Sequence, residues 1–247
     1  MLQPSAPSDE TIALLDADPE LAALVPGPQR EAARGRAVAR VQRLEDGPWT
    51  FQPLRHPAAF GMLVLEGLVG ARVAIGSEAH IEVVGTSDLL RPWVHIGPGA
   101  SVPSDVDWRV FSSTTVAMLD EHFALAVAPW PQIAAALMHR LVLRSRRLSF
   151  QLALAGINRT DERLLIALWH FADRWGHVTP EGVTLKLELT QGQLGEVIRV
   201  ARPSVSSAIN DLRRAGVIAY ERSTCTWTLH GDPPQQAATL KRRLALD

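Results

Sequence analysis

The spacing of hydrophobic and polar residues predicts a β-rich region in the first half of the chain. Between residues 38 and 120, short apolar runs are separated by glycines and prolines, most clearly at 61–76 and 80–85. Several short strands at this spacing are typical of an antiparallel barrel or sandwich. Further strands are expected at 93–97 and 113–120. We therefore predict an N-terminal antiparallel β domain.

Short helices are expected before this β region. Residues 8–25 are rich in Ala, Leu and acidic residues. Asp18 followed by Pro19 is a typical helix start, because a carboxylate can cap the first turn and proline fits the first helical position. The pattern predicts one or two short helices here.

A long helix is expected at residues 129–157, which contain no acidic residue and no glycine before Gly156. At 1.5 Å per residue it would span about 40 Å. Apolar residues recur along it at steps of three, four or seven and form one stripe. We expect this stripe to pack against a second copy of the chain, although packing on the chain's own domain is the alternative. The stripe consists of Ile133, Leu137, Leu141, Leu148 and Leu152.

The C-terminal part has the pattern of helix, hairpin, two helices and a second hairpin. An amphipathic helix over 161–176 follows Thr160, which we expect to cap it. Two short runs around Pro180-Glu181-Gly182 predict a hairpin. Thr190 is expected to cap the next helix, and Gly216 is expected to end the one after it. Residues 217–231 read as two alternating strands.

The helix at 201–216 has one apolar and one polar side. Val205, Ile209 and Leu212 lie four and three residues apart, so they share the buried side. The other side carries short or basic hydrogen-bonding residues, which suit the major groove of duplex DNA. Three serines lower the helix propensity, a local cost that a DNA-binding role explains. The candidate DNA-binding residues are Thr190, Gln191, Arg202, Ser204, Ser206, Ser207, Asn210 and Arg213.

Residues 189–218, LTQGQLGEVIRVARPSVSSAINDLRRAGVI, resemble the cyclic-AMP receptor/Fnr family of bacterial transcription regulators. Residues 59–90 look like the family's sensor β-roll, and the helix at 129–157 falls where its dimerisation helix would. The resemblance implies an α+β chain with an N-terminal antiparallel β-roll (1–128), a dimerisation helix (129–157) and a C-terminal winged helix-turn-helix (158–247).

The resemblance also implies a function and roles for individual residues. The chain is expected to be a cytoplasmic homodimer that reads a pseudo-palindromic site in double-stranded DNA, with RNA polymerase as a further partner. Arg202 would contact a phosphate or a guanine, and Thr190 and Ser204 would bond phosphates. The residues expected at base edges are Ser206, Ser207 and Asn210.

Two positions depart from the family pattern. Pro203 stands where the family commonly has Glu, and Ser207 stands where it commonly has Arg. Both changes remove long side chains that read bases. We therefore do not expect the operator of the best-known members, and we expect a specificity that is either looser or based on DNA shape.

The sensor region also departs from the family. Cyclic-nucleotide binders of this fold use Gly-Glu on the ribose and Arg-Ser or Arg-Thr on the cyclic phosphate. Arg91-Pro92-Trp93 stands at the first place, and Asp105 and Asp107 would compete for Arg109 at the second. We do not expect cyclic AMP to bind in the usual way, and we expect no cofactor. The effector-binding candidates are Arg91, Trp93 and Arg109.

Other cofactors have little support in the sequence. Cys225 is the single cysteine, which excludes a disulfide within the chain and an iron–sulfur cluster, and fits a reducing cytosol. His56, His80 and His95 are candidate haem ligands, but isolated histidines are more often surface or core residues.

Charge favours a polyanionic partner for the second half. Residues 1–128 hold 9 basic and 16 acidic residues, whereas residues 129–247 hold 16 basic and 10 acidic ones. No run of about 18 apolar residues predicts a membrane span. The first ten residues carry two acids and no base, unlike a secretory signal.

An enzyme is the least supported class. Common nucleophile, zinc, P-loop and dinucleotide motifs are absent from the sequence. Asp120-Glu121-His122 is an acid–acid–His cluster, but we expect adjacent side chains to point apart. The main alternative to a DNA-binding regulator is a signalling or scaffold protein with a degenerate roll and no sequence-specific DNA binding.

Overall fold

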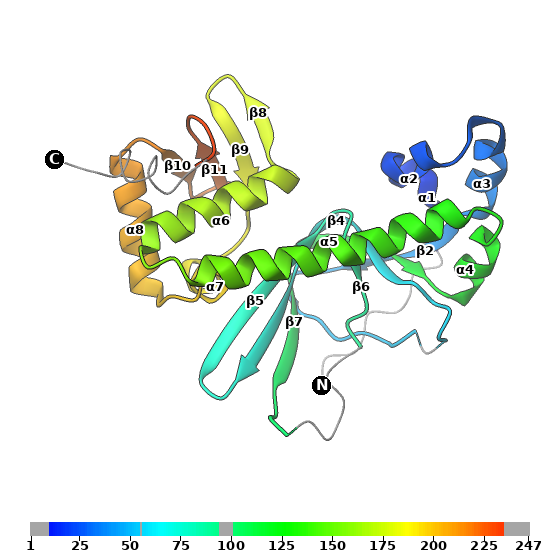
Figure 1. Cartoon of the computed structure of the whole chain (residues 1–247), viewed down its shortest axis with the longest axis horizontal. Coiled ribbons are helices and arrows are strands. Elements are labelled where there is room, and N and C mark those ends of the chain that lie inside the picture. Colours follow the sequence, from blue (N-terminus) through cyan, green and yellow to red (C-terminus); the bar gives the residue numbers. More distant parts are fainter. Residues whose placement is uncertain (1–9, 55, 94–100, 235–247) are drawn as a thin grey trace. The chain divides into compact units, whose positions relative to one another are not determined.

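The structure is a computed structural model that describes residues 10–54, 56–93 and 101–234. It contains two compact units, residues 1–78 with 82–147 and residues 79–81 with 148–247 (Figure 1). The division falls within the long helix, so the boundaries expected at 128/129 and 157/158 stay predictions. No helix in the described ranges has both the length and the apolar character that crossing a membrane requires.

A seven-stranded sheet forms the centre of the first unit, with the main strand order β1-β2-β7-β4-β5. Strands β4 and β7 pair antiparallel from Gly61 opposite Leu119 to Ala74 opposite Asp105. The strands predicted at 61–76 and 80–85 are confirmed, and the strand predicted at 113–120 is the end of a longer strand. The strand predicted at 93–97 lies almost wholly outside the described residues. The strands are β1 (Thr11–Ala13), β2 (Val38–Leu44), β3 (Gly47–Pro48), β4 (Gly61–Ile75), β5 (Glu78–Gly85), β6 (Leu89–Leu90) and β7 (Asp105–Leu119).

Short helices precede and follow this sheet. Asp18 caps α2 by accepting a hydrogen bond from the Leu21 N–H at 3.1 Å, and Pro19 is the first helical residue. The predicted helix start is therefore confirmed, although the short strand β1 before it was not predicted. The helices are α1 (Leu14–Ala17), α2 (Pro19–Leu24), α3 (Arg30–Arg36) and α4 (Glu121–Val127), with a 3-10 turn at Gly27–Gln29.

Helix α5 (Pro131–Ala155) is the predicted long helix, and part of its apolar stripe packs inward. Ile133 and Leu137 are fully buried in the core of the first unit, and Leu141 packs against the same core. Ile133 and Leu137 are therefore unavailable to a second copy, which corrects the expected dimer stripe. The sequence misled because α5 is apolar on two sides, and periodicity does not tell which side meets the sheet.

Three arginines extend the inward side of α5 at steps of four and three. Each pairs with an acidic residue of the same unit, and the Arg144–Glu82 pair has two contacts of 2.7 and 2.8 Å. Such bidentate pairs fix the orientation of a helix as well as its position. The pairs are Arg140 with Asp18, Arg144 with Glu82 and Arg147 with Asp88.

The second unit contains the predicted helices and hairpins in the expected order. Its four-stranded sheet has the order β10-β11-β9-β8, so the two hairpins lie side by side. Thr160 is the first residue of α6 and does not cap it, because Arg159 occupies the cap position without a side-chain cap bond. The elements are α6 (Thr160–Trp175), β8 (His177–Thr179), β9 (Gly182–Lys186), α7 (Gln191–Ile198), α8 (Arg202–Arg214), β10 (Ile218–Glu221) and β11 (Thr226–Leu229).

Candidate nucleic-acid interface

Helix α7 begins with a reciprocal capping box. The Thr190 hydroxyl accepts from the Gln193 N–H at 3.2 Å, and the Gln193 side chain accepts from the Thr190 N–H at 2.7 Å. Both hydrogen bonds satisfy donors that a helix start leaves unpaired. The cap that the sequence predicts at Thr190 is confirmed, and its hydroxyl is engaged in this box.

The turn between α7 and α8 depends on one left-handed residue and on a close approach of the backbone to α7. Arg199 has φ 57° and ψ 54°, in the left-handed region, and it is not a glycine. Val200 donates its N–H to the Gly195 carbonyl at 2.9 Å. A Cβ on Gly195 would lie 2.6 Å from the Val200 carbonyl oxygen, so this turn folds back closely over α7.

A buried arginine holds the same turn from the side of α6. The Arg163 guanidinium donates to the carbonyl of Ile157 at 2.9 Å, of Ile198 at 2.9 Å and of Arg199 at 3.3 Å. These carbonyls lie at or just past helix ends, where intrahelical donors run out. The role of Arg163 was not predicted from the sequence. Its position among the apolar residues of an amphipathic helix could have indicated a buried, hydrogen-bonded arginine.

Helix α8, orange in Figure 1, packs against α6 and α7 and leaves one side exposed. Val205, Ile209 and Leu212 are buried as predicted, at 4% exposure or less. Ser204 and Ser206 are only half-buried, and Thr190 is exposed. The exposed residues along α8 are Arg202, Pro203, Ser207, Asn210, Arg213 and Arg214.

One predicted pair of DNA-binding residues is engaged within the domain. The Ser206 hydroxyl donates to the Gln191 side-chain oxygen at 2.9 Å, joining α8 to the start of α7. Ser206 is therefore oriented by Gln191 and is less accessible than Ser207. The sequence placed Ser206 and Ser207 together at the base edges, because it could not show which of two adjacent serines faces α7.

Helix α8 ends as predicted at Gly216, which has φ 66°. Val217 donates to the Leu212 carbonyl at 3.2 Å and Gly216 donates to the Arg213 carbonyl at 3.0 Å. This pair of bonds is a Schellman motif, which favours glycine at the left-handed position. The chain is thereby directed into the hairpin formed by β10 and β11.

The β10–β11 hairpin carries the single tyrosine and the single cysteine. The Tyr220 ring stacks on Trp227 at 4.2 Å between centroids. Burial of the phenol raises the pKa of Tyr220, and the neighbouring Cys225 raises it further. Cys225 itself is half-buried and has φ 53°.

The effector-binding candidates of the first unit are not brought together. Arg91 and Trp93 are half-buried, and the Trp93 ring lies 6.4 Å from Phe51. Arg109 is exposed, while its neighbour Trp108 is buried on the other side of β7. Side chains alternate across a strand, so Arg109 points away from the aromatic rings.

Four aromatic side chains pack together in the first unit. Trp49 and Trp108 lie edge to face at 5.8 Å, and Phe51 lies 5.6 Å from Trp49 and 6.5 Å from Trp108. With Trp93 they belong to one apolar core cluster or pack against it. These contacts are those of a packed core.

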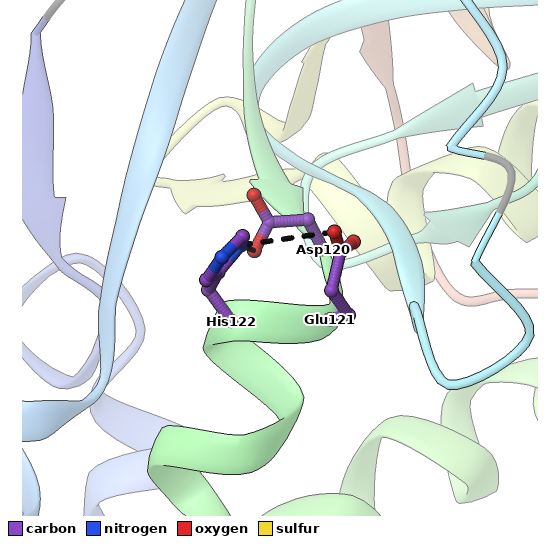
Figure 2. A group of neighbouring side chains, drawn as sticks. All are labelled: Asp120, Glu121 and His122. Carbon is purple, nitrogen blue, oxygen red and sulfur yellow. Dashed lines mark ion pairs between the residues drawn. The ribbon is translucent and has the colours of Figure 1, made fainter.

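Asp120, Glu121 and His122 come together at the start of α4, as Figure 2 shows. Their ligand atoms lie within 4.8 Å of one another, so the expectation that they point apart is wrong. Asp120 accepts from the Phe123 N–H at 3.0 Å and from Arg40 at 3.1 Å, so both oxygens already have protein donors. These contacts explain Asp120 as a helix cap.

The same cluster borders an open hollow of about 550 Å³ that His56 and Arg40 also line. His56 accepts the Ala58 N–H through Nδ1 at 3.2 Å, and Arg40 brings a positive charge to the hollow. This arrangement does not favour a cation. Of the other candidate haem ligands, His80 is half-buried and His95 lies outside the described residues.

Comparison with known sequences agrees with this geometry. Residues 162–229 match the Crp-like helix-turn-helix domain. The chain is 26% identical over 155 residues to a CRP-like cAMP-activated global transcriptional regulator of Mycobacterium tuberculosis, covering 62% of this chain and 67% of that protein. It is 22% identical over 208 residues to the global nitrogen regulator of Synechococcus elongatus, covering 80% of this chain and 89% of that protein.

Solved structures share the fold over most of the chain. FixK2 from Bradyrhizobium japonicum has a TM-score of 0.59 at 16% identity, covering 85% of this chain and 98% of that one. A CooA mutant from Carboxydothermus hydrogenoformans has a TM-score of 0.58 at 16% identity, covering 97% and 98%. The predicted α+β fold, with an antiparallel N-terminal sheet and a winged helix, is confirmed. Residues 162–229 therefore form a Crp-like helix-turn-helix domain, and these comparisons support the resemblance of the chain to the cyclic-AMP receptor/Fnr family.

Proposed function

We propose that this chain is a homodimeric transcription regulator that places α8 in the major groove of a pseudo-palindromic DNA site. This proposal rests on the division of α8 into a buried apolar side and an exposed polar side. Its apolar residues anchor it on α6 and α7, while Arg202, Ser207, Asn210 and Arg213 are exposed along the other side. A helix with short polar side chains outward and cations at both ends fits the groove between two phosphate backbones.

An exposed apolar seam on α5 supports the dimer. Met138, Val142 and Leu152 are 52%, 51% and 70% exposed in the single chain. Together with exposed small residues they follow heptad spacing, with steps of three and four, as in a two-stranded coiled coil. We assign the dimer contact to this seam in place of the predicted Ile133 and Leu137. The seam consists of Ala135, Met138, Val142, Ser145, Ser149 and Leu152.

A divergent sensor is the second part of the proposal. Arg109, the candidate for a cyclic phosphate, is exposed, and Asp107 lies within 4.0 Å of Arg72. The aromatic rings of Trp49, Phe51 and Trp108 fill space against one another. The M. tuberculosis relative is named as cAMP-activated, but these features support a different effector or none for this chain.

We further propose that catalysis is not the main activity of this chain and that RNA polymerase is a partner. The relatives are transcription regulators, and the acid–acid–His cluster is accounted for by the start of α4.

Isothermal titration of the pure protein with cyclic AMP tests the sensor, and we expect no saturable heat. A micromolar dissociation constant would contradict the divergent-sensor proposal.

DNA binding is tested with the full chain and duplexes from the DNA upstream of its own gene. We expect a protected site of two half-sites about one helical turn apart, roughly 34 Å. Affinity should fall steeply with salt, and Arg202→Ala should flatten that slope by about one unit. Dimerisation without DNA protection would favour the scaffold alternative.

The dimer is tested by introducing a carboxylate at either of two leucines that are almost equally exposed in the single chain. Leu152→Glu places a carboxylate in the seam, whereas Leu125→Glu changes a residue of α4 that is 71% exposed. In sedimentation velocity we expect Leu152→Glu to shift the protein to monomer and Leu125→Glu to leave the dimer intact. A Leu152→Glu variant that stays dimeric would place the interface elsewhere.

A further inference from the structure

We propose that α8 reads an A·T core in each half-site, with adenine facing Asn210 and thymine facing Pro203. This inference rests on the proposed function, because it assumes that α8 lies in the major groove. It goes further by naming the bases and the atoms that recognise them.

Three exposed residues form the reading row of α8. Pro203, Ser207 and Asn210 lie at steps of four and three, so they share one side of the helix. Seven residues at 1.5 Å each span about 10 Å, which matches roughly three base-pair steps. The row therefore covers the centre of one half-site.

The chemistry of the row favours A·T pairs. Asn210 carries both a donor and an acceptor, and its amide can bond adenine N7 and N6 together. Pro203 has no polar side-chain atom, so its contact with a base edge is apolar, and the thymine methyl is the apolar group of the major groove. Ser207 is short and can donate or accept, so it discriminates little between bases.

No side chain in the row is specific for a G·C pair. Guanine is read by Arg or Lys, and cytosine by Glu or Asp. Asp211, which follows Asn210 in the sequence, is half-buried and pairs with Arg214 at 2.6 Å. Arg202 and Arg213 lie at the two ends of α8, where they can reach phosphates, and Ser206 is held by Gln191.

Preference for A·T pairs can also arise from DNA shape, without any base contact. The two origins differ at single atoms. Replacing adenine by 7-deazaadenine removes the N7 acceptor, and replacing thymine by deoxyuridine removes only the methyl group. If the contact is direct, each base replacement lowers the affinity of the wild type for DNA. It does not lower the affinity of the variant that lacks the partner side chain.

The first experiment selects bound sequences from randomised duplexes with the full-length protein at fixed salt. We expect adenine and thymine at the core of each half-site. Asn210→Ala should lose the adenine preference and weaken binding to the selected site by about five-fold or more. Ser207→Ala, in the same row, should select the same core, and Ser207→Arg should add a guanine preference.

The second experiment measures affinity for the selected duplex with single-atom replacements. We expect 7-deazaadenine to weaken the wild type by about five-fold and to change Asn210→Ala by less than about two-fold. Replacing thymine by deoxyuridine should weaken DNA binding by the wild type more than it weakens DNA binding by Pro203→Ser. These results would support both contacts.

Two outcomes would overturn the inference while leaving DNA binding intact. One is a G·C core in the selected sites. The other is salt-dependent binding in which 7-deazaadenine affects the wild type and Asn210→Ala equally. Loss of salt-dependent duplex binding in the wild type would instead overturn the proposed function itself, so the two failures are distinguishable.

Discussion

Arg140 and Asp18, 122 residues apart in the sequence, form a buried bidentate ion pair. Their two contacts measure 2.5 and 2.9 Å, and the side chains are 10% and 6% exposed. Asp18 also caps α2 through the Leu21 N–H. One carboxylate therefore starts an N-terminal helix and ties it to α5.

Removing one partner of this pair should destabilise the first unit strongly. Arg140→Met leaves the Asp18 charge buried without its cation, a change that costs about 3–5 kcal/mol in comparable sites. Arg34→Met is the matched control, because Arg34 makes a bidentate pair with Asp16 that is about half exposed. That change should cost about 1 kcal/mol or less. Urea unfolding measures both, and equal losses would contradict the role assigned to Arg140.

The left-handed residue in the turn before α8 predicts a stabilising substitution. Arg199 has φ 57°, a conformation that costs side-chain-bearing residues about 1–2 kcal/mol. Arg199→Gly removes this cost but gains entropy in the unfolded chain, so we expect a net gain of about 0.5–1 kcal/mol. Arg199→Ala keeps the strain and should bring no gain. The idea fails if the glycine variant unfolds at lower urea than the alanine variant.

Two glycines of α7 should respond oppositely to alanine. A Cβ on Gly195 would lie 2.6 Å from the backbone oxygen of Val200, so Gly195→Ala should cost about 1–3 kcal/mol through displacement of the turn. A Cβ on Gly192 meets only the Thr190 hydroxyl at 3.8 Å. Gly192→Ala should therefore be neutral or stabilise by up to about 1 kcal/mol. Thermal and urea unfolding compare the stabilities of the two variants. Similar effects would show that the turn can move away from a Cβ at Gly195 at little cost.

The single tyrosine allows a direct titration in the winged domain. Burial, with a further contribution from Cys225, raises the pKa of Tyr220. Its phenol should therefore ionise at a pH above the ordinary tyrosine pKa of about 10. The folded state then holds the proton more tightly than the unfolded state. Stability should therefore be unaffected well below pH 10 and fall as the pH rises from there through the folded pKa.

Phenolate absorbance near 295 nm measures this pKa in the folded protein. Cys225→Ser removes the contribution of Cys225 and should move the midpoint toward the ordinary value without abolishing the shift from burial. A midpoint at or below the value in urea would contradict the partly buried position of the phenol.

Local signals in the sequence were sufficient where a few neighbouring residues decide the structure. The caps at Asp18 and Thr190 and the glycine stop at Gly216 involve contacts within three to five residues along the chain. The buried side of α8 follows from the spacing of Val205 and Leu212. These features required no knowledge of the rest of the fold.

The helix α5 shows where local signals were not sufficient. Its sequence offers two apolar sides, one through Ile133 and Leu137 and another through Met138 and Val142. The structure buries the first and exposes the second, because the arginines beyond Leu137 meet acids of the sheet and the N-terminal helices. No pattern along α5 itself contains those acids.

By itself, the sequence determined the main strands and helices, the caps at Asp18 and Thr190 and the winged helix-turn-helix, since helix and strand periodicity and capping act over short distances. Only the tertiary structure decided which serine of α8 faces α7, that Arg109 points away from Trp108, and which side of α5 is free. Those outcomes depend on partners far away in the chain, such as Asp18 for Arg140 and Gln191 for Ser206. Burial and pairing between distant segments select among alternatives that local energies leave nearly equal.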